Sequence, residues 1–153
     1  MSFVEKVCRC LEENKISYAL VGGYAVALHG APRGTIDVDF IIRFEEQDFI
    51  NLQVALDSIG LKPRLPVTAK QIFQFRKEYI EQRNLIAWSF VNPNNPIEMV
   101  DIIITKNLAD CSTISKNLGN ITVKIISKKE LIKMKQVAGR AQDLLDIKAL
   151  ERL

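Results

Sequence analysis

Two aspartates separated by one residue are the first candidates for chemistry. Asp37 and Asp39 alternate with apolar residues in the segment Ile36-Asp-Val-Asp-Phe40. If this segment is a strand, both carboxylates project from one face while the apolar residues point to the other. Neighbouring carboxylates repel each other unless a cation lies between them, and hard divalent cations prefer several oxygen ligands. The pattern therefore predicts a divalent-metal site that uses Asp37 and Asp39.

A third acid lies in a later apolar segment, residues 98–104, which reads Glu-Met-Val-Asp-Ile-Ile-Ile. Asp101 is surrounded there by residues typical of a buried strand, where a charge is costly unless it is paired or bound to metal. Glu98 is an odd number of residues away, so it faces the other side. Asp101 is therefore the better candidate for a third ligand. Taken singly, each acid could instead be a turn residue or a structural ion-pair partner.

The glycine pair Gly22-Gly23 ends an apolar segment and precedes a short helical one. Unpaired backbone N–H groups at such a turn attract phosphate, and glycine allows a close approach. The Walker pattern is absent because Tyr24 and Ala25 follow the glycines, and the Rossmann pattern is absent too. Many strand-to-helix turns contain glycine, so the pair alone does not identify a phosphate site. It gains meaning if the turn and the acids meet at one cleft.

Hydrophobic periodicity and capping signals predict alternating helices and strands. Hairpin signals among the helices favour an α+β fold with a mixed, partly antiparallel sheet flanked by helices. We expect one domain over residues 1–153, with C-terminal helices from about residue 128 packed on it. The predicted strands are residues 17–21, 35–43, 85–91, 97–105 and 121–126. The predicted helices begin after Ser2 and end near Asn14, and cover 24–29, 45–59, 69 to about 79, 128 to about 138, and the segment after Gly139-Arg140. Residues 106–119 are expected to be irregular.

Composition suits a soluble globular protein. The 153 residues are 48% hydrophobic and 25% charged, with a net charge of +3. No apolar run approaches the ~20 residues of a membrane span, and the N-terminus lacks the layout of a signal peptide. We therefore expect a cytoplasmic protein with no membrane partner. The three cysteines are odd in number, which favours reduced thiols over a disulfide framework.

Together these segments resemble the DNA polymerase beta-type nucleotidyltransferase superfamily. The resemblance rests on Val21-Gly22-Gly23, on residues 36–40 and on Val100-Asp101-Ile102, in that order and spacing. The stretches GGYAVALHGAPRGTIDVDF and KMKQVAGRAQDLLDIKAL resemble the minimal and AbiEii-like nucleotidyltransferases, some of which serve in bacterial toxin–antitoxin systems. The likeness covers about residues 18 to 150. Many relatives carry Gly-Ser where this chain has Gly22-Gly23, so a phosphate-binding hydroxyl is missing.

The resemblance implies roles for the candidate residues. Asp37 and Asp39 would hold two Mg²⁺ ions that bridge a nucleoside triphosphate. Asp101 would complete one metal site and help to deprotonate an acceptor hydroxyl. The amides of Gly22 and Gly23 would bind the β- and γ-phosphates.

Basic residues are the remaining candidates. We expect Arg33 and Lys135 to contact the nucleotide, although Arg33 could be only a turn residue. Later, Arg140, Asp143 and Asp146 fall partly on one helical face and could form an internal ion-pair network. Their roles stay open, as does that of His29, which the sequence favours as a structural residue at a helix end.

The expected function is Mg²⁺-dependent transfer of a nucleoside monophosphate from an NTP, with ATP favoured, to an acceptor hydroxyl, releasing pyrophosphate. The acceptor is open among proteins, tRNA 3′ ends and small molecules. A toxin–antitoxin system with a partner toxin or antitoxin is the expected setting. The alternatives are an antibiotic nucleotidyltransferase of the aminoglycoside or lincosamide type, or a non-catalytic nucleotide- or partner-binding module. The enzymatic hypothesis requires that Asp101 shares a cleft with Asp37 and Asp39.

Overall fold

The computed structural model describes residues 1–31 and 33–153. The strands are β1 (Tyr18–Val21), β2 (Val38–Ile42), β3 (Lys62–Pro63), β4 (Ala87–Asn92), β5 (Asn95–Ile103), β6 (Thr113–Leu118) and β7 (Ile121–Ile126). The helices are α1 (Phe3–Glu13), α2 (Gly22–Leu28), α3 (Glu46–Ser58), α4 (Ala69–Gln74), α5 (Arg76–Arg83), α6 (Lys128–Ala138) and α7 (Ala141–Glu151), with the 3-10 turn η1 (Leu108–Asp110).

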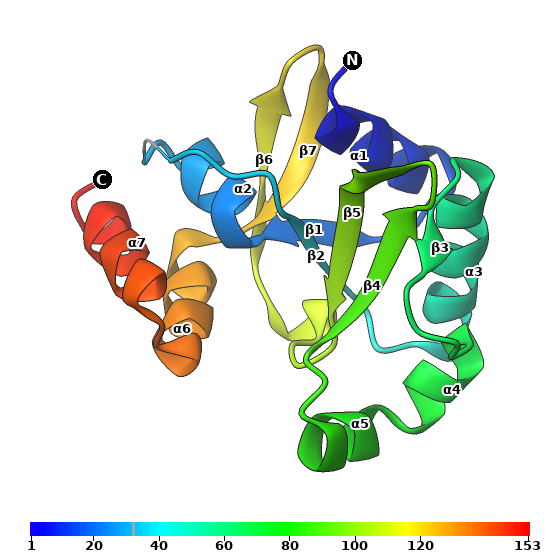
Figure 1. Ribbon diagram of the computed structural model, residues 1–153. Helices are drawn as coiled ribbons and strands as arrows, with labels where there is room; N and C mark the ends of the chain where they lie inside the picture. Colours follow the sequence, from blue (N-terminus) through cyan, green and yellow to red (C-terminus); the bar gives the residue numbers. More distant parts are fainter. Residues whose placement is uncertain (32) are drawn as a thin grey trace.

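The strands form one mixed sheet in the order β3-β4-β5-β2-β1-β7-β6 (Figure 1). Two pairings are parallel, β1 with β7 and β2 with β5, and the others are antiparallel. The predicted α+β fold with a mixed, partly antiparallel sheet is therefore confirmed.

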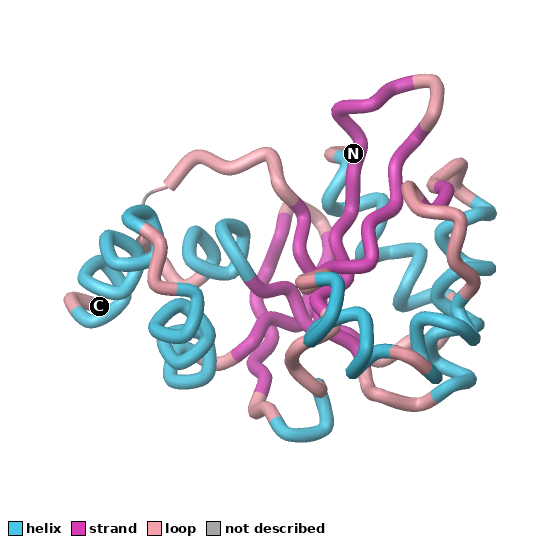
Figure 2. Tube along the Cα trace, turned by 60° about the horizontal axis from the view of Figure 1, so that its bottom comes forward, coloured by secondary structure: helices cyan, strands magenta, loops and turns pink. Residues whose placement is uncertain are grey.

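Helices cover the two faces of the sheet unequally. One face packs against α1, α3 and α4 around a core that includes Phe40, Phe49 and Trp88. The other face carries α2, α6 and α7, whose apolar residues meet Val21 and Ile41 from the central strands. Figures 1 and 2 show α6 and α7 at one end of the molecule, away from the β4–β5 hairpin. On the second face, Ile103 of β5 packs against the cluster that α2, α6 and α7 form with the central strands.

Three predicted helix starts are present with their caps. Ser2, Thr68 and Ser127 each accept a hydrogen bond from the backbone N–H three residues later. Thr68 and Gln71 complete a reciprocal capping box, because the Gln71 side chain accepts from the Thr68 backbone. Local side-chain chemistry thus fixes where these helices begin.

Three predictions about the secondary structure are wrong. The second strand begins at Val38 rather than at residue 35, so Asp37 lies in the preceding loop. The helix expected from residue 69 to about 79 breaks at Phe75 into α4 and α5. The segment 106–119 is not irregular, because it contains β6. As an edge strand, β6 pairs only with β7 and buries no face completely, so its sequence lacks the alternation that marks a half-buried strand.

None of the described helices combines the length and apolar character needed to cross a membrane. Cys8, Cys10 and Cys111 are free thiols, the first two buried.

Candidate functional site

The strand register aligns the acids in one row across the sheet. Asp39 in β2 pairs with Asp101 in the parallel strand β5 and, on its other side, with Val21 at the end of β1. Neighbouring strands lie about 4.8 Å apart, so residues in register present their side chains side by side. Val38 and Phe40 enter the first core, so Asp39 faces the side that carries α2, α6 and α7. The two acids and the Gly22-Gly23 turn therefore meet at one point.

Asp37 joins this site from the loop before β2. It is exposed, and its backbone N–H is donated to Thr35 Oγ1 at 3.3 Å. Asp37, Asp39 and Asp101 all line one cavity of about 370 Å³. Within residues 1–31 and 33–153, however, no three Asp, Glu, His or Cys side chains are close enough to hold one ion together. The structure thus brings the predicted acids to a shared cavity without closing them into a single ligand cluster.

Asp39 is harder to ionise than a free aspartate. Burial, followed by the charges of Asp101 and Asp37, raises the pKa of Asp39 to about 7, although Lys135 and Arg140 act in the opposite direction. Desolvation and like charge both penalise the ionised carboxylate. A cation among these oxygens would remove that penalty, so the donor set fits a hard divalent ion.

The glycines make room for the acid and for an arginine. Gly22 has a left-handed backbone (φ +65°), and a Cβ there would overlap Asp39 Oδ2. A Cβ on Gly23 would overlap Arg33 Nη1 and lie 2.7 Å from Thr35 Oγ1. The side chains of Asp39, Arg33 and Thr35 therefore lie directly over the backbone of the turn.

An ion-pair network forms the wall of the cavity opposite the acids. Lys135 is buried, with Nζ 3.3 Å from Asp143 Oδ1 and 2.9 Å from Asp146 Oδ2, the second contact lacking hydrogen-bond geometry. Arg140 Nε donates to Asp143 Oδ2 at 2.7 Å, and Arg33 Nε lies 3.2 Å from Asp146 Oδ1. Arg140, Asp143 and Asp146 thus occupy an internal network, as the helical spacing suggested. Arg33 and Lys135 line the cavity as well, but their charges are directed at these two aspartates.

Ser89 is a site residue that the sequence did not reveal. Its Oγ donates to Asp101 Oδ1 at 2.5 Å, from the neighbouring position on β4. This bond orients the Asp101 carboxylate and leaves its second oxygen available. The register that pairs them shifts between Val91 and Asn92, so counting back from the turn would have placed a different residue beside Asp101.

His29 lies outside this cavity. Its Nε2 is 2.8 Å from the carbonyl oxygen of Ile126, which ties the end of α2 to the end of β7. Burial lowers the pKa of His29, so the neutral ring that donates to this carbonyl is favoured. The contact is structural, in line with the favoured interpretation.

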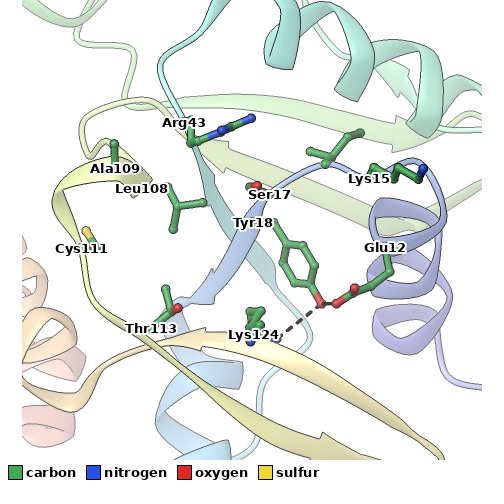
Figure 3. A pocket seen from close by; sticks show the side chains of 11 residues that line it. Glu12, Lys15, Ser17, Tyr18, Arg43, Leu108, Ala109, Cys111, Thr113 and Lys124 are labelled. Carbon is green, nitrogen blue, oxygen red and sulfur yellow. Dashed lines mark hydrogen bonds between the residues drawn. The ribbon is translucent and has the colours of Figure 1, made fainter.

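A larger cavity, of about 620 Å³, opens around the start of β1 and contains none of the three acids (Figure 3). The Tyr18 hydroxyl donates there to Glu12 at 2.9 Å. Lys15, Arg43 and Lys124 line it, and the last two contact Asp48 and Ser115, respectively. The larger of these two cavities is therefore not the one that contains the candidate catalytic acids.

Replacing Gly22 by alanine tests the close approach at the turn. We expect Gly22→Ala to lower the free energy of unfolding by about 1–2 kcal/mol, because alanine disfavours the left-handed backbone and its Cβ displaces Asp39. Gly34→Ala is the matched control, since a Cβ there meets no atom within 4 Å and the backbone is not left-handed. Urea denaturation of both variants measures the difference, and equal stabilities would contradict this account of Gly22.

Replacing Lys135 by methionine tests the buried network. Lys135→Met leaves Asp143 and Asp146 buried with less compensation, and we expect a loss of about 3 kcal/mol, since Arg33 and Arg140 remain as partners. Lys133→Met, on the same helix, removes an ammonium with 55% side-chain exposure and should change stability by less than about 0.5 kcal/mol. Thermal and urea denaturation measure the free energy of unfolding of both variants. Equal losses in the two variants would show that the buried network does not stabilise the fold.

We compared the chain with protein-family models, with curated proteins and with solved structures. No protein-family model and no curated protein sequence matches the chain. Three solved structures share the fold over most of their length and most of this chain. One is an antigenic nucleotidyltransferase-like protein from Paracoccidioides brasiliensis, which is 18% identical in sequence and superposes with a TM-score of 0.61. The match covers 96% of this chain and 72% of the fungal protein's chain.

The other two are an antibiotic adenylyltransferase and an antibiotic-resistance factor. The lincosamide antibiotic adenylyltransferase LnuA, in a lincomycin-bound structure, is 17% identical with a TM-score of 0.64, covering 97% of this chain and 94% of its own. The antibiotic-resistance factor ANT(2'')-Ia is 10% identical with a TM-score of 0.65. The match covers 97% of this chain and 80% of the ANT(2'')-Ia chain. At these identities the likeness concerns the fold alone, and the fold is that of nucleotidyltransferase-like proteins.

Proposed function

We propose that this protein is a metal-dependent nucleotidyltransferase, which transfers a nucleoside monophosphate from an NTP to an acceptor hydroxyl. One observation carries the proposal: Asp39 and Asp101 stand side by side, against the Gly22-Gly23 turn, on an open cavity. Paired acids beside a glycine turn suit metal-assisted phosphoryl chemistry, and the fold shared with nucleotidyltransferase-like proteins supports this interpretation.

The residues present fit a divalent metal. Asp39 and Asp101 supply carboxylate oxygens, and the raised pKa of Asp39 reports negative charge that lacks full compensation. Asp37 adds a third carboxylate from the loop that borders the same cavity. Bound Mg²⁺, for which we propose two ions as in the family that the sequence resembles, would neutralise the carboxylates and the phosphate oxygens as charge develops.

The triphosphate is proposed to lie between the Gly22-Gly23 turn and the cationic wall. Two cations are free enough to turn toward it: Arg33, whose side chain is 23% exposed and pairs with Asp146, and Arg140, whose side chain is 77% exposed and pairs with Asp143. Lys135, with 7% side-chain exposure and two aspartates around its ammonium, contributes positive charge from a fixed position in that wall. Binding an anion here loosens the hold of Asp146 on Arg33 without removing a charge from the core.

The reaction balances without a further reactant. The acceptor oxygen forms a bond to the α-phosphorus, while the bond from that phosphorus to the bridging oxygen breaks. The electron pair of the broken bond leaves with pyrophosphate. The hydroxyl proton passes to the free carboxylate oxygen of Asp101 and then to solvent. Ser89 holds the other oxygen of Asp101 in place during this transfer.

Two biological settings are proposed in order. A role in a toxin–antitoxin system, with ATP as donor and a partner toxin or antitoxin, rests on the sequence resemblance. Antibiotic adenylylation is the second candidate, because LnuA and ANT(2'')-Ia share the fold and are described as an antibiotic adenylyltransferase and an antibiotic-resistance factor.

Asparagine substitutions test the acids directly. We expect the unaltered protein to bind ATP in a Mg²⁺-dependent manner, and Asp39→Asn and Asp101→Asn to weaken that binding by more than about tenfold, because each loses a charged oxygen ligand. Asp110→Asn, at an exposed position in η1, should bind as the unaltered protein does. Titration calorimetry with and without EDTA decides the matter; metal-independent binding, or equal affinity in all variants, would sink the proposal.

Ser89 offers a test of how Asp101 is oriented. Ser89→Ala removes the hydrogen bond to Asp101 and should weaken Mg²⁺ binding about tenfold, in the range seen for groups that orient metal ligands. Ser89→Thr keeps the hydroxyl and suits a strand, so it should restore most of the affinity. The measurement is the Mg²⁺-induced rise in melting temperature across a titration. If alanine and threonine give the same curve, Ser89 does not orient the ligand.

A further inference from the structure

Two hydrogen-bond donors lie directly over the backbone of Gly23. A Cβ at this position would overlap Arg33 Nη1, and it would lie 2.7 Å from Oγ1 and 2.8 Å from Cβ of Thr35. The backbone of Gly23 is not left-handed, so its conformation alone does not require glycine. Glycine is required because a guanidinium and a hydroxyl group, both from the loop before β2, fill the space that a side chain would need.

The hydroxyl group of Thr35 has a proton left to donate. Its oxygen accepts the backbone N–H of Asp37 at 3.3 Å, and a hydroxyl can donate one hydrogen bond in addition to those that it accepts. Among residues 1–31 and 33–153, no group accepts a hydrogen bond from Thr35 Oγ1. Thr35 lines the cavity that contains the three acids. Its hydroxyl proton is therefore available to a ligand in that cavity.

Arg33 brings further donors to the same place. Its Nε lies 3.2 Å from Asp146 Oδ1, while Nη1 of the same guanidinium lies over Gly23. One side chain thus contacts both the buried acid and the turn. A hydroxyl and a guanidinium that converge on one backbone position suit an anion with several oxygens, because charge-assisted hydrogen bonds to such oxygens are short and strong.

The turn itself supplies no serine or threonine hydroxyl, since Gly22-Gly23 is followed by Tyr24 and Ala25. Thr35 instead reaches over the turn from the loop before β2. The structure therefore places a hydroxyl beside position 23 although the residue at that position has none. Glycine at 23 and threonine at 35 depend on each other, because a larger residue at 23 would displace Thr35.

We propose that the Thr35 hydroxyl donates a hydrogen bond to the β- or γ-phosphate of the bound nucleotide, beside Arg33 and over Gly23. This inference rests on the proposed function, since it assigns a ligand group to one part of the same cavity. The acids mark the reacting α-phosphorus, and Asp39 lies against Gly22. The donors over Gly23 are one residue further along the turn, where the phosphates of the leaving group follow. A donor held there stabilises the charge that pyrophosphate gains as the bond breaks.

Valine at position 35 keeps the branched shape of threonine and removes the hydroxyl. We expect Thr35→Val to weaken Mg²⁺-dependent ATP binding at least about tenfold, because a hydrogen bond to a charged group is lost. AMP, which has no β- or γ-phosphate, should bind equally well to both proteins. Thr35→Ser should retain most of the ATP affinity, and Thr122→Val, at an exposed position of β7, is the matched control. Titration calorimetry measures the ATP affinities, and competition with ATP measures that of AMP. An unchanged ATP affinity in Thr35→Val, or equal losses for ATP and AMP, would overturn the proposal.

Moving the hydroxyl to position 23 separates its chemistry from the packing of the loop. Thr35→Gly vacates the space beside the turn, and Gly23→Ser then places a hydroxyl on the turn itself. Gly23→Ala in the same background fills that space without a hydroxyl. We expect the double variant with serine to bind ATP at least about fivefold more tightly than the double variant with alanine. Equal affinities would show that a hydroxyl at this place does not hold the nucleotide.

Two further measurements separate the possible failures. Because Thr35 also accepts from Asp37, its loss could act through a metal ligand. The Mg²⁺-induced rise in melting temperature should therefore be the same in Thr35→Val and in the unaltered protein; a weaker rise in the variant would assign Thr35 to the orientation of Asp37 and overturn the proposal. Absent ATP binding by the unaltered protein overturns the proposed function and this inference with it. Intact binding that does not respond to Thr35→Val overturns this inference alone.

Discussion

The burial of Asp39 beside a second carboxylate, that of Asp101, is the constraint at the centre of this protein. Adjacent parallel strands hold the two carboxylates in register, and packing of their neighbours in the core prevents either from turning away. Burial is the larger cause of the raised pKa of Asp39, and the charges of Asp101 and Asp37 add to it. A glycine at position 22 is required because any larger residue would compete with Asp39 for space. The glycine at the turn thus makes room for this crowded pair, and the charges of Lys135 and Arg140 partly offset the rise in the pKa of Asp39.

The cations are held by a second pair of acids. Asp143 and Asp146 fix Lys135, Arg140 and Arg33 along one wall of the cavity. Buried pairs of this kind contribute little net stability, but they hold charge in a defined place. The wall therefore stays positive toward the cavity while its own charge is largely balanced. The same two aspartates join α6, α7 and the loop before β2, so the position of the C-terminal helices and the electrostatics of the cavity are linked.

Much of this could be predicted from the sequence, and what could not has identifiable causes. Capping residues and apolar periodicity predicted most helices and the mixed sheet, because these signals are local. The strand β6 escaped prediction because an exposed edge strand has no apolar face. Asp37 was placed in a strand, since sequence alternation continues past the point where backbone pairing ends. Ser89 could not be placed because a register shift in the hairpin is set by the turn geometry and not by residue pattern.

The site residues that lie in register across the sheet come together only when the central strands pair during folding. Ser89, Asp101, Asp39 and Val21 come from four strands, and the pairing between β2 and β5 is parallel, so it cannot form from a simple hairpin. Long-range pairings of this kind form slowly, after the cost of closing a long loop has been met. An ion bound between Asp39 and Asp101 would bind only the chain in which that pairing exists, and so would stabilise the folded state by mass action. The concentration of such an ion would then set the fraction of chains in which the central strands are paired.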